Sequence, residues 1–309
     1  MLVGHPDQRK QFEAALASGR LHHAWLLTGP RGIGKRRFAD LAALQLLAGQ
    51  GADISEEHPV ARLVAAGSHP DHRVLAREVD EKGKVAAEIK VDQVRALQAL
   101  FRSTPGLGAW RTVIIDSIDD MNRAAANSFL KSLEEPPVQT VFFLISHAPA
   151  RLLPTIRSRC RSMGFRKLGT EQCREVLEAA GVEPERLDAL TALADGAPGE
   201  ALRFAGEGVD GLGDAIESLL RGGDLTTFAR QFQPQSAQAR MEALTILAPR
   251  RLAQAARRAP SAELLTLYER ADTLAQDAVR LAYDRVQVAF ALGQLLVRAG
   301  QLEGKSPRP

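Results

Sequence analysis

Residues 23–35 decide the fold; they are His-Ala-Trp-Leu-Leu-Thr-Gly-Pro-Arg-Gly-Ile-Gly-Lys. The run that ends at Thr28 is short and apolar, which is typical of a buried strand. Helical spacing of apolar residues follows it, from Gly34 to Leu47. The loop between them fits G-x-x-x-x-G-K, a pattern whose backbone N–H groups wrap a phosphate while its lysine adds charge. The predicted phosphate-binding residues are Gly29, Gly32, Gly34 and Lys35.

Strand and helix signals alternate through the first half of the chain. Arg111–Asp116 is a β-branched run that ends in an acid, and 140–145 is another buried strand. Between them we expect a helix over 123–135, capped by Asn122 and stopped by two prolines. A strand over 72–76 and a helix over 91–101 are also expected. Such alternation predicts an α/β fold with a parallel sheet covered on both faces.

Strand signals disappear after about Phe165, and short helical segments follow from Thr170 onward. A stretch with four glycines, 206–213, is typical of a linker, and a long helical stretch runs from Pro260 through Arg298. A chain of 309 residues holds about two domains, or three small ones. We expect an α/β domain over 1–166, a small helical lid domain over 167–207 and a C-terminal all-helical domain over 208–309.

Composition excludes several classes of protein. Two cysteines, Cys160 and Cys173, cannot frame a disulfide-rich secreted scaffold or a four-cysteine zinc site. The N-terminus lacks the apolar region of a signal peptide, and no apolar run approaches the ~18 residues that span a bilayer. A cytoplasmic protein is therefore expected. The net charge of +3 argues against a protein that binds nucleic acid alone by charge.

Two positions depart from a working nucleotide hydrolase. The residue after Lys35 is normally Ser or Thr, whose hydroxyl binds Mg²⁺, but here it is Arg36, which cannot ligate a cation. Asp116 ends its strand as the acid expected near Mg²⁺, yet Ser117 stands where a catalytic glutamate is usual. We expect no required cofactor, at most weak ATP binding at this loop, and no efficient hydrolysis.

Three further runs carry a resemblance to one family. They are Asn127-Ser-Phe-Leu-Lys-Ser-Leu-Glu-Glu-Pro-Pro137, Phe142-Phe-Leu-Ile-Ser146 and Leu153-Pro-Thr-Ile-Arg-Ser-Arg-Cys160. Together with 23–35 and His69-Pro-Asp71, they resemble the clamp-loader branch of the AAA+ ATPases over roughly residues 5–205. The resemblance implies an AAA+ P-loop domain, then a helical lid and a C-terminal helical collar. Proteins of this family load the ring-shaped sliding clamp onto primer–template DNA.

The departures distinguish between the two kinds of subunit in this family. Gamma/tau, the hydrolysing motor, would keep Thr after the lysine and Asp-Glu on the acidic strand. It would also carry a nucleotide-sensing arginine in the lid, whereas 196–200 holds none and the next arginine is Arg203. These features favour a non-motor subunit whose own ATPase is defective. A gamma/tau-like active ATPase is the alternative, and any polymerase activity would belong to the assembled holoenzyme.

The Ser158-Arg159-Cys160 triplet is intact. The resemblance implies that Arg159 acts in trans as an arginine finger, reaching the γ-phosphate of ATP on a neighbouring subunit. A planar cation there stabilises the charge on the transferred phosphate. Six basic residues and no acid lie between Glu135 and Glu171: Arg151, Arg157, Arg159, Arg161, Arg166 and Lys167. The alternative is an ordinary solvated basic helix end.

Relatives commonly hold zinc with four cysteines in the loop before His69, but residues 49–70 contain none. The nearby acids and histidines have neither the spacing nor the softness that a structural zinc needs, so we expect no metal. The resemblance implies gamma/tau and delta subunits as partners, with the sliding clamp and primer–template DNA reached through the assembly, and no membrane. A nucleic-acid binder that acts alone is the second alternative.

Overall fold

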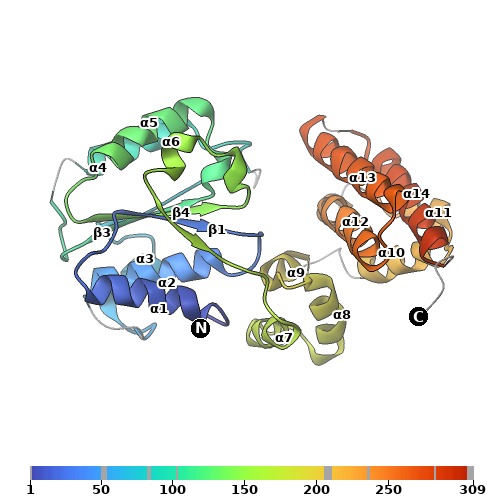
Figure 1. Cartoon of the computed structure of the whole chain (residues 1–309), viewed down its shortest axis with the longest axis horizontal. Coiled ribbons are helices and arrows are strands. Elements are labelled where there is room, and N and C mark those ends of the chain that lie inside the picture. The colour runs from blue at the N-terminus through green and yellow to red at the C-terminus, as the bar shows by residue number, and fades with distance from the viewer. Residues whose placement is uncertain are drawn as a thin grey trace. The chain divides into compact units, whose positions relative to one another are not determined.

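The computed structural model describes residues 2–49, 54–81, 85–101, 104–204, 211–234, 237–281 and 283–304. The chain divides into two compact units, Met1–Val176 and Leu177–Pro309 (Figure 1). The helix α7, Thr170–Ala179, spans the division between them. The finer division into 1–166, 167–207 and 208–309 stays a prediction.

A five-stranded parallel sheet forms the centre of the first unit, in the order β2-β3-β4-β1-β5. The strands are β1 Ala24–Thr28, β2 His72–Ala76, β3 Arg111–Asp116, β4 Thr140–Ser146 and β5 Arg161–Gly164. Every residue of β4 is buried, as expected of a parallel strand covered on both faces. The predicted α/β fold with a parallel sheet is confirmed.

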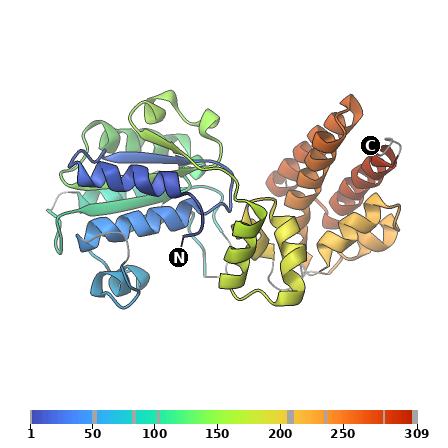
Figure 2. The same cartoon turned by 60° about the horizontal axis from the view of Figure 1, so that its bottom comes forward.

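Helices cover both faces of this sheet (Figure 1 and Figure 2). One face carries α4 Val91–Leu100, α5 Arg123–Glu134 and α6 Pro154–Arg157, and the other carries α1 Pro6–Ala17 and α2 Lys35–Ala48. The helix α3, Pro59–Ala65, packs against α2. Under α5, Phe129 meets Phe142 of β4 edge-to-face, with 5.3 Å between ring centroids. On the opposite face, the ring centroid of Phe12 lies 5.5 Å from that of Trp25 and 6.0 Å from that of Phe38. These aromatic contacts fix the helices against the sheet.

The predicted cap of α5 is present, since the Asn122 side chain accepts a hydrogen bond from the Ala125 N–H at 2.9 Å. The helix ends at Glu134, one residue earlier than the sequence predicts. Two single-turn 3₁₀ helices complete the unit, η1 Ile118–Asp120 and η2 Pro149–Arg151. The end of α5 is tied to the sheet because His23 Nε2 lies 3.2 Å from the Leu133 carbonyl.

The described residues of the second unit form helices joined by turns and short irregular segments, with no strand among them. Its helices are α8 Pro184–Ala194, α9 Pro198–Phe204, α10 Leu212–Leu220, α11 Leu225–Arg230, α12 Gln238–Arg258, α13 Ala262–Leu281 and α14 Arg285–Glu303. Gly300 lets α14 approach α10 closely, because an added Cβ would lie 1.8 Å from the Leu220 carbonyl oxygen. None of the helices in the described ranges is long and apolar enough to cross a membrane.

The helical stretch expected from Pro260 through Arg298 consists of two helices, α13 and α14. Asp284 starts the second helix as its N-cap, accepting a hydrogen bond from the Gln287 N–H at 2.9 Å. The two helices share one apolar core with α10, α11 and α12. A single long rod could not have buried both apolar faces in this core.

Candidate functional site

The loop between β1 and α2 has the backbone that the glycine pattern predicts. Gly29, Gly32 and Gly34 have φ values of 139°, 71° and 101°, a region that other residues rarely adopt. At Gly29 space is also short, because an added Cβ would lie 2.4 Å from the backbone oxygen of Phe165, directly after β5. The loop is therefore built on positions that require glycine.

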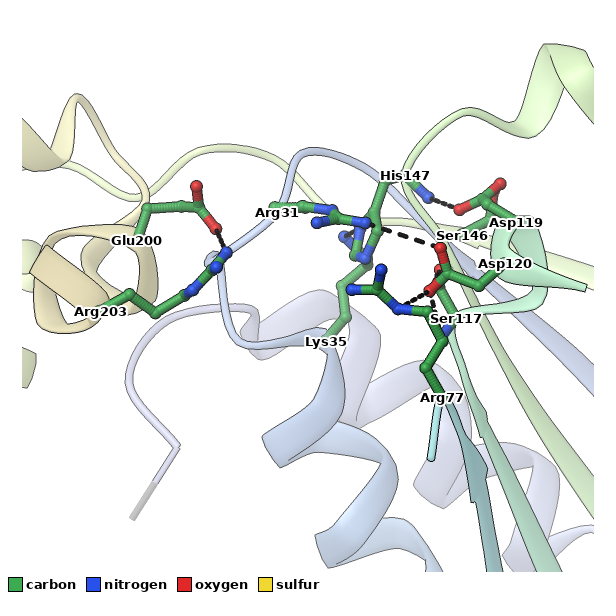
Figure 3. Close-up of polar contacts among 10 residues, drawn as sticks. All are labelled: Arg31, Lys35, Arg77, Ser117, Asp119, Asp120, Ser146, His147, Glu200 and Arg203. Carbon is green, nitrogen blue, oxygen red and sulfur yellow. Dashed lines mark hydrogen bonds and ion pairs between the residues drawn. The ribbon is translucent and has the colours of Figure 1, made fainter. Parts of the chain in front are cut away.

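Lys35 folds inward at the base of this loop and is only 3% exposed. Its ammonium donates to the carbonyls of Gly29 and Pro30, both at 2.5 Å, and lies 2.9 Å from His147 Nδ1 (Figure 3). Burial, together with the neighbouring Lys35 charge, lowers the pKa of His147 to about 4. The imidazole is therefore neutral at pH 7, and its Nδ1 can accept the lysine hydrogen bond.

Arg36 occupies the place beside the acidic strand end where a magnesium ion would need ligands. Its Nε lies 2.9 Å from Asp40 Oδ1, and its Nη1 lies 3.3 Å from Asp116 Oδ2. Burial alone would lower the pKa of Arg36, but hydrogen bonds and attraction from the two carboxylates outweigh it and raise that pKa. The guanidinium is thus permanently charged and neutralises the acids around it.

This donor set does not fit Mg²⁺. The position that should supply a hydroxyl carries a cation, and the acid that should face the metal is paired with that cation. Across the described ranges, no three His, Cys, Asp or Glu side chains are grouped so that they could hold a metal ion. The expectation of no zinc remains a prediction.

The acids beyond Asp116 are used within the fold. Asp119 accepts hydrogen bonds from the Ser146 hydroxyl at 2.8 Å and the His147 N–H at 2.5 Å. Asp120 accepts one from the Ser117 hydroxyl at 2.9 Å, as Figure 3 shows. Ser117 therefore caps η1 and places no carboxylate beside Asp116.

Three residues at this edge were missed by the sequence analysis: Arg31, Arg77 and His147. Arg77 Nε lies 3.5 Å from Asp120, and Arg31 lies 4.0 Å from the same carboxylate. A signal was available, because Arg77 directly follows β2 and His147 directly follows β4. Carboxyl ends of parallel strands meet at one edge of a sheet, where ligands bind in open α/β folds.

Arg159 lies at the other edge of the sheet. It precedes Arg161, which starts β5 and pairs with Trp25 near the beginning of β1, whereas Gly29 follows the end of β1. Arg159 Nη2 lies 2.9 Å from Glu134 Oε1, and its Nη1 donates to the Thr155 carbonyl at 3.0 Å. The five predicted loop and strand-end residues therefore gather at one edge, and Arg159 lies apart from them.

Cys160, next to Arg159 in the sequence, is a packed thiol. It is half-buried and lies against the core under α5 and α6. Burial raises its pKa to about 12, so the thiol stays protonated at neutral pH. Cys173 is buried in α7. Neither cysteine has the properties of a nucleophile.

In the second unit, the segment that resembles the sensor region holds an ion-pair cluster. Glu200 is almost fully buried, and its carboxylate lies 3.6 Å from Arg203 Nη1 and 3.3 Å from Arg250 Nη2. Figure 3 includes the Glu200–Arg203 pair. These contacts show that Arg203 and Arg250 neutralise a buried acid within their own unit.

The family model described as "DNA polymerase III, delta subunit" matches residues 4–169, more than half of the chain. The chain belongs to this family. A relative named DNA polymerase III subunit delta' from Pseudomonas aeruginosa is 46% identical over 191 residues, covering 60% of this chain and 57% of that protein. The Escherichia coli subunit delta' is 38% identical over 162 residues, covering 51% of this chain and 47% of the relative. The chain thus spans about half the length of these delta' relatives.

Related tau subunits match at lower identity. The Salmonella typhimurium subunit tau is 32% identical over 216 residues, covering 67% of this chain and 32% of that protein. Among solved structures, a gamma subunit-related protein of DNA polymerase III from Thermotoga maritima has a TM-score of 0.51 at 17% identity, covering 94% of this chain and 99% of that one. This last likeness shows the fold, and the sequence matches show the family.

Proposed function

We propose that this chain is a delta-prime-type subunit of the bacterial DNA polymerase III clamp loader, which helps to load the sliding clamp onto primed DNA. It hydrolyses little or no ATP itself and supplies Arg159 to the ATP site of a neighbouring gamma/tau subunit. The observation that carries the proposal is the Arg36 guanidinium between Asp40 and Asp116, in the place of a metal ligand. The higher identity to delta' relatives than to the tau relative, 46% against 32%, supports the same subunit type.

The chemistry of the loop supports a subunit that is not a motor. Phosphoryl transfer from ATP needs a metal ion that bridges the phosphates and a group that orients the attacking water. Arg36 holds Asp116 in an ion pair, and the Ser117 hydroxyl donates to Asp120, so neither residue provides these functions. The intact glycine backbone and Lys35 leave a cradle that would bind ATP weakly, and ATP is not required for the proposed role.

The position of Arg159 supports action in trans. Its own phosphate loop lies at the carboxyl edge of the sheet, whereas Arg159 lies at the amino edge, so it cannot serve that loop. A guanidinium at an exposed edge can meet the ATP of an adjacent subunit and stabilise the charge that develops during transfer. The proposed partners are therefore gamma/tau beside this edge and delta in the same ring. The sliding clamp and primer–template DNA are reached through that assembly, in the cytoplasm.

Reconstitution tests the proposal directly. The chain is mixed with gamma/tau and delta, and ATP hydrolysis stimulated by the clamp and primed DNA is measured. Arg159→Ala should leave assembly intact and lower the stimulated rate several-fold, because one ATP site loses its transition-state cation. Arg157→Ala is the matched control, since Arg157 is an exposed arginine only two residues earlier, at the end of α6. Unchanged hydrolysis with Arg159→Ala would contradict the trans role.

The alternative, a gamma/tau-like active ATPase, is favoured by the intact glycine loop and by the tau relatives. It predicts robust, saturable hydrolysis of Mg-ATP by the isolated chain that Lys35→Ala abolishes. We instead expect the isolated wild-type chain and its Lys35→Ala variant to hydrolyse ATP only at the background rate. Tight, salt-dependent DNA binding by the isolated chain would instead support a nucleic-acid binder that acts alone.

A further inference from the structure

The guanidinium of Arg159 is held on two sides by its own subunit. Nη2 lies 2.9 Å from Glu134 Oε1, and Nη1 donates to the carbonyl of Thr155 at 3.0 Å. The side chains of Arg159 and Glu134 remain 34% and 48% exposed. A guanidinium has five N–H donors in a rigid plane, so it can keep both contacts and still present an N–H edge to a phosphate.

Glu134 is placed where a carboxylate does not help its helix. It is the last residue of α5, where the partial negative charge of the helix end repels an acid. An exposed ion pair adds little stability to a fold. The presence of an acid here is therefore better explained by the arginine that it holds than by the stability of α5.

The backbone that carries the Glu134 carboxylate is also held in place by its neighbours. Pro136 and Pro137 prevent α5 from continuing, and the preceding carbonyl, that of Leu133, is fixed by His23 at 3.2 Å. The opposite anchor, Thr155, belongs to the short helix α6, which packs against α5. Both contacts to Arg159 thus come from well-packed elements.

We propose that Glu134 is a positioning residue for the arginine finger, holding the Arg159 side chain extended at the surface in the orientation that the neighbour's phosphate requires. This inference rests on the proposed role of Arg159. An arginine whose rotamers are already restricted loses less conformational entropy when it engages the transition state. Loss of Glu134 should therefore lower kcat of the neighbouring site and leave the KM for ATP unchanged, because the finger acts mainly during transfer.

The test uses the reconstituted complex of this chain with gamma/tau and delta, with clamp and primed DNA. Glu134→Gln should lower kcat about two- to five-fold, the range of one exposed ion pair, at an unchanged KM for ATP. Glu134→Asp keeps the charge and should retain more of the rate than Glu134→Gln. Glu135→Gln is the matched control, because it removes the same charge one residue further along the chain and should behave as wild type.

The double variant Glu134→Gln/Arg159→Ala should match Arg159→Ala alone, because Glu134 acts only through that arginine. A further loss in the double variant would overturn the inference. A wild-type or raised kcat for Glu134→Gln, or failure of this variant to assemble by gel filtration, would also overturn it. If Arg159→Ala itself has no effect, the proposed trans role fails first, so the two failures can be distinguished.

Discussion

Two arginines at opposite edges of one sheet illustrate how the same side chain takes contrasting roles. Arg36 is held by two carboxylates, Asp40 and Asp116, beside the chain's own phosphate loop. Arg159 is held by one carboxylate and one carbonyl at the other edge. Arg36 places its charge beside Asp116, where a magnesium ion would need ligands, whereas the proposed role of Arg159 is to reach the ATP of another subunit. Exposure does not separate the two side chains, which are 41% and 34% exposed; what separates them is the edge of the sheet at which each one lies.

A substitution in the phosphate loop should cause the largest loss of stability. Gly29→Ala is expected to lower the free energy of unfolding by about 3 kcal/mol, because the new Cβ would meet the backbone oxygen of Phe165 at 2.4 Å with φ at 139°. Backbone cannot move aside as a flexible side chain can. Urea unfolding monitored by circular dichroism measures the change.

Gly49→Ala is the matched control for this variant. Its φ of 63° and ψ of 21° lie in the left-handed region, which alanine adopts at a smaller cost than the φ of 139° at Gly29, and nothing lies within 4 Å of an added Cβ. We expect a loss of about 1 kcal/mol there, from strain alone. Equal losses at both glycines would mean that the close approach to Phe165 contributes nothing.

Replacing Arg36 with a residue that can bind a metal ion should make ATP binding at the chain's own loop depend on Mg²⁺. Arg36→Thr removes the guanidinium from Asp116 and restores a hydroxyl, so ATP affinity should rise about tenfold in Mg²⁺ and fall again with EDTA. The wild-type chain should show no such dependence on Mg²⁺. Isothermal titration calorimetry measures the ATP affinity of the isolated wild-type and Arg36→Thr chains, each with Mg²⁺ and with EDTA.

Arg37→Thr is the control for this exchange, because Arg37 is an exposed neighbour of equal charge on α2. If it raises affinity as much as Arg36→Thr, the gain comes from a general change in charge. A wild-type affinity that already increases with Mg²⁺ would contradict the role assigned to Arg36.

The sequence predicted those parts of the molecule that depend on local spacing. The glycines of the phosphate loop and the Asn122 cap of α5 are fixed by neighbouring residues, and both are present. The helical pattern from Pro260 through Arg298 did not predict where one helix ends and the next begins, because Asp284 is one polar position within it. Its N-cap role depends on the packing that turns the chain there.

The missed site residues share one physical reason. Arg31, Arg77 and His147 follow three separate strands, and only the pairing of those strands brings them to their partners at one edge of the sheet. The place of His147 directly after β4 predicts the edge of the sheet at which it lies, but not its contact with Lys35, which is distant in sequence. Local patterns therefore identified the loop but not the side chains that surround it.

The smallest expected effect is a pH dependence of the phosphate-loop edge. His147 has its pKa lowered from 6.5 to about 4, by burial first and then by Lys35 and Arg31. As the pH falls below about 6.5, the unfolded chain binds a proton at His147 that the folded chain does not bind until about pH 4. The free energy of unfolding therefore falls as the pH drops from about 6.5 towards 4, and levels off below that. Because the imidazole is partly exposed, solvent screening reduces the expected loss of stability to about 1 kcal/mol between pH 7 and pH 5.

His147→Gln tests this assignment, because glutamine can still accept the Lys35 hydrogen bond but does not titrate. The urea midpoint of the variant should fall less between pH 7 and pH 5 than that of the wild type, by the equivalent of about 1 kcal/mol. His72, whose pKa is also lowered to about 4 by burial first, remains in both proteins, so its contribution cancels in the comparison. Identical pH dependence in the two proteins would mean that His147 titrates alike in the folded and unfolded chains.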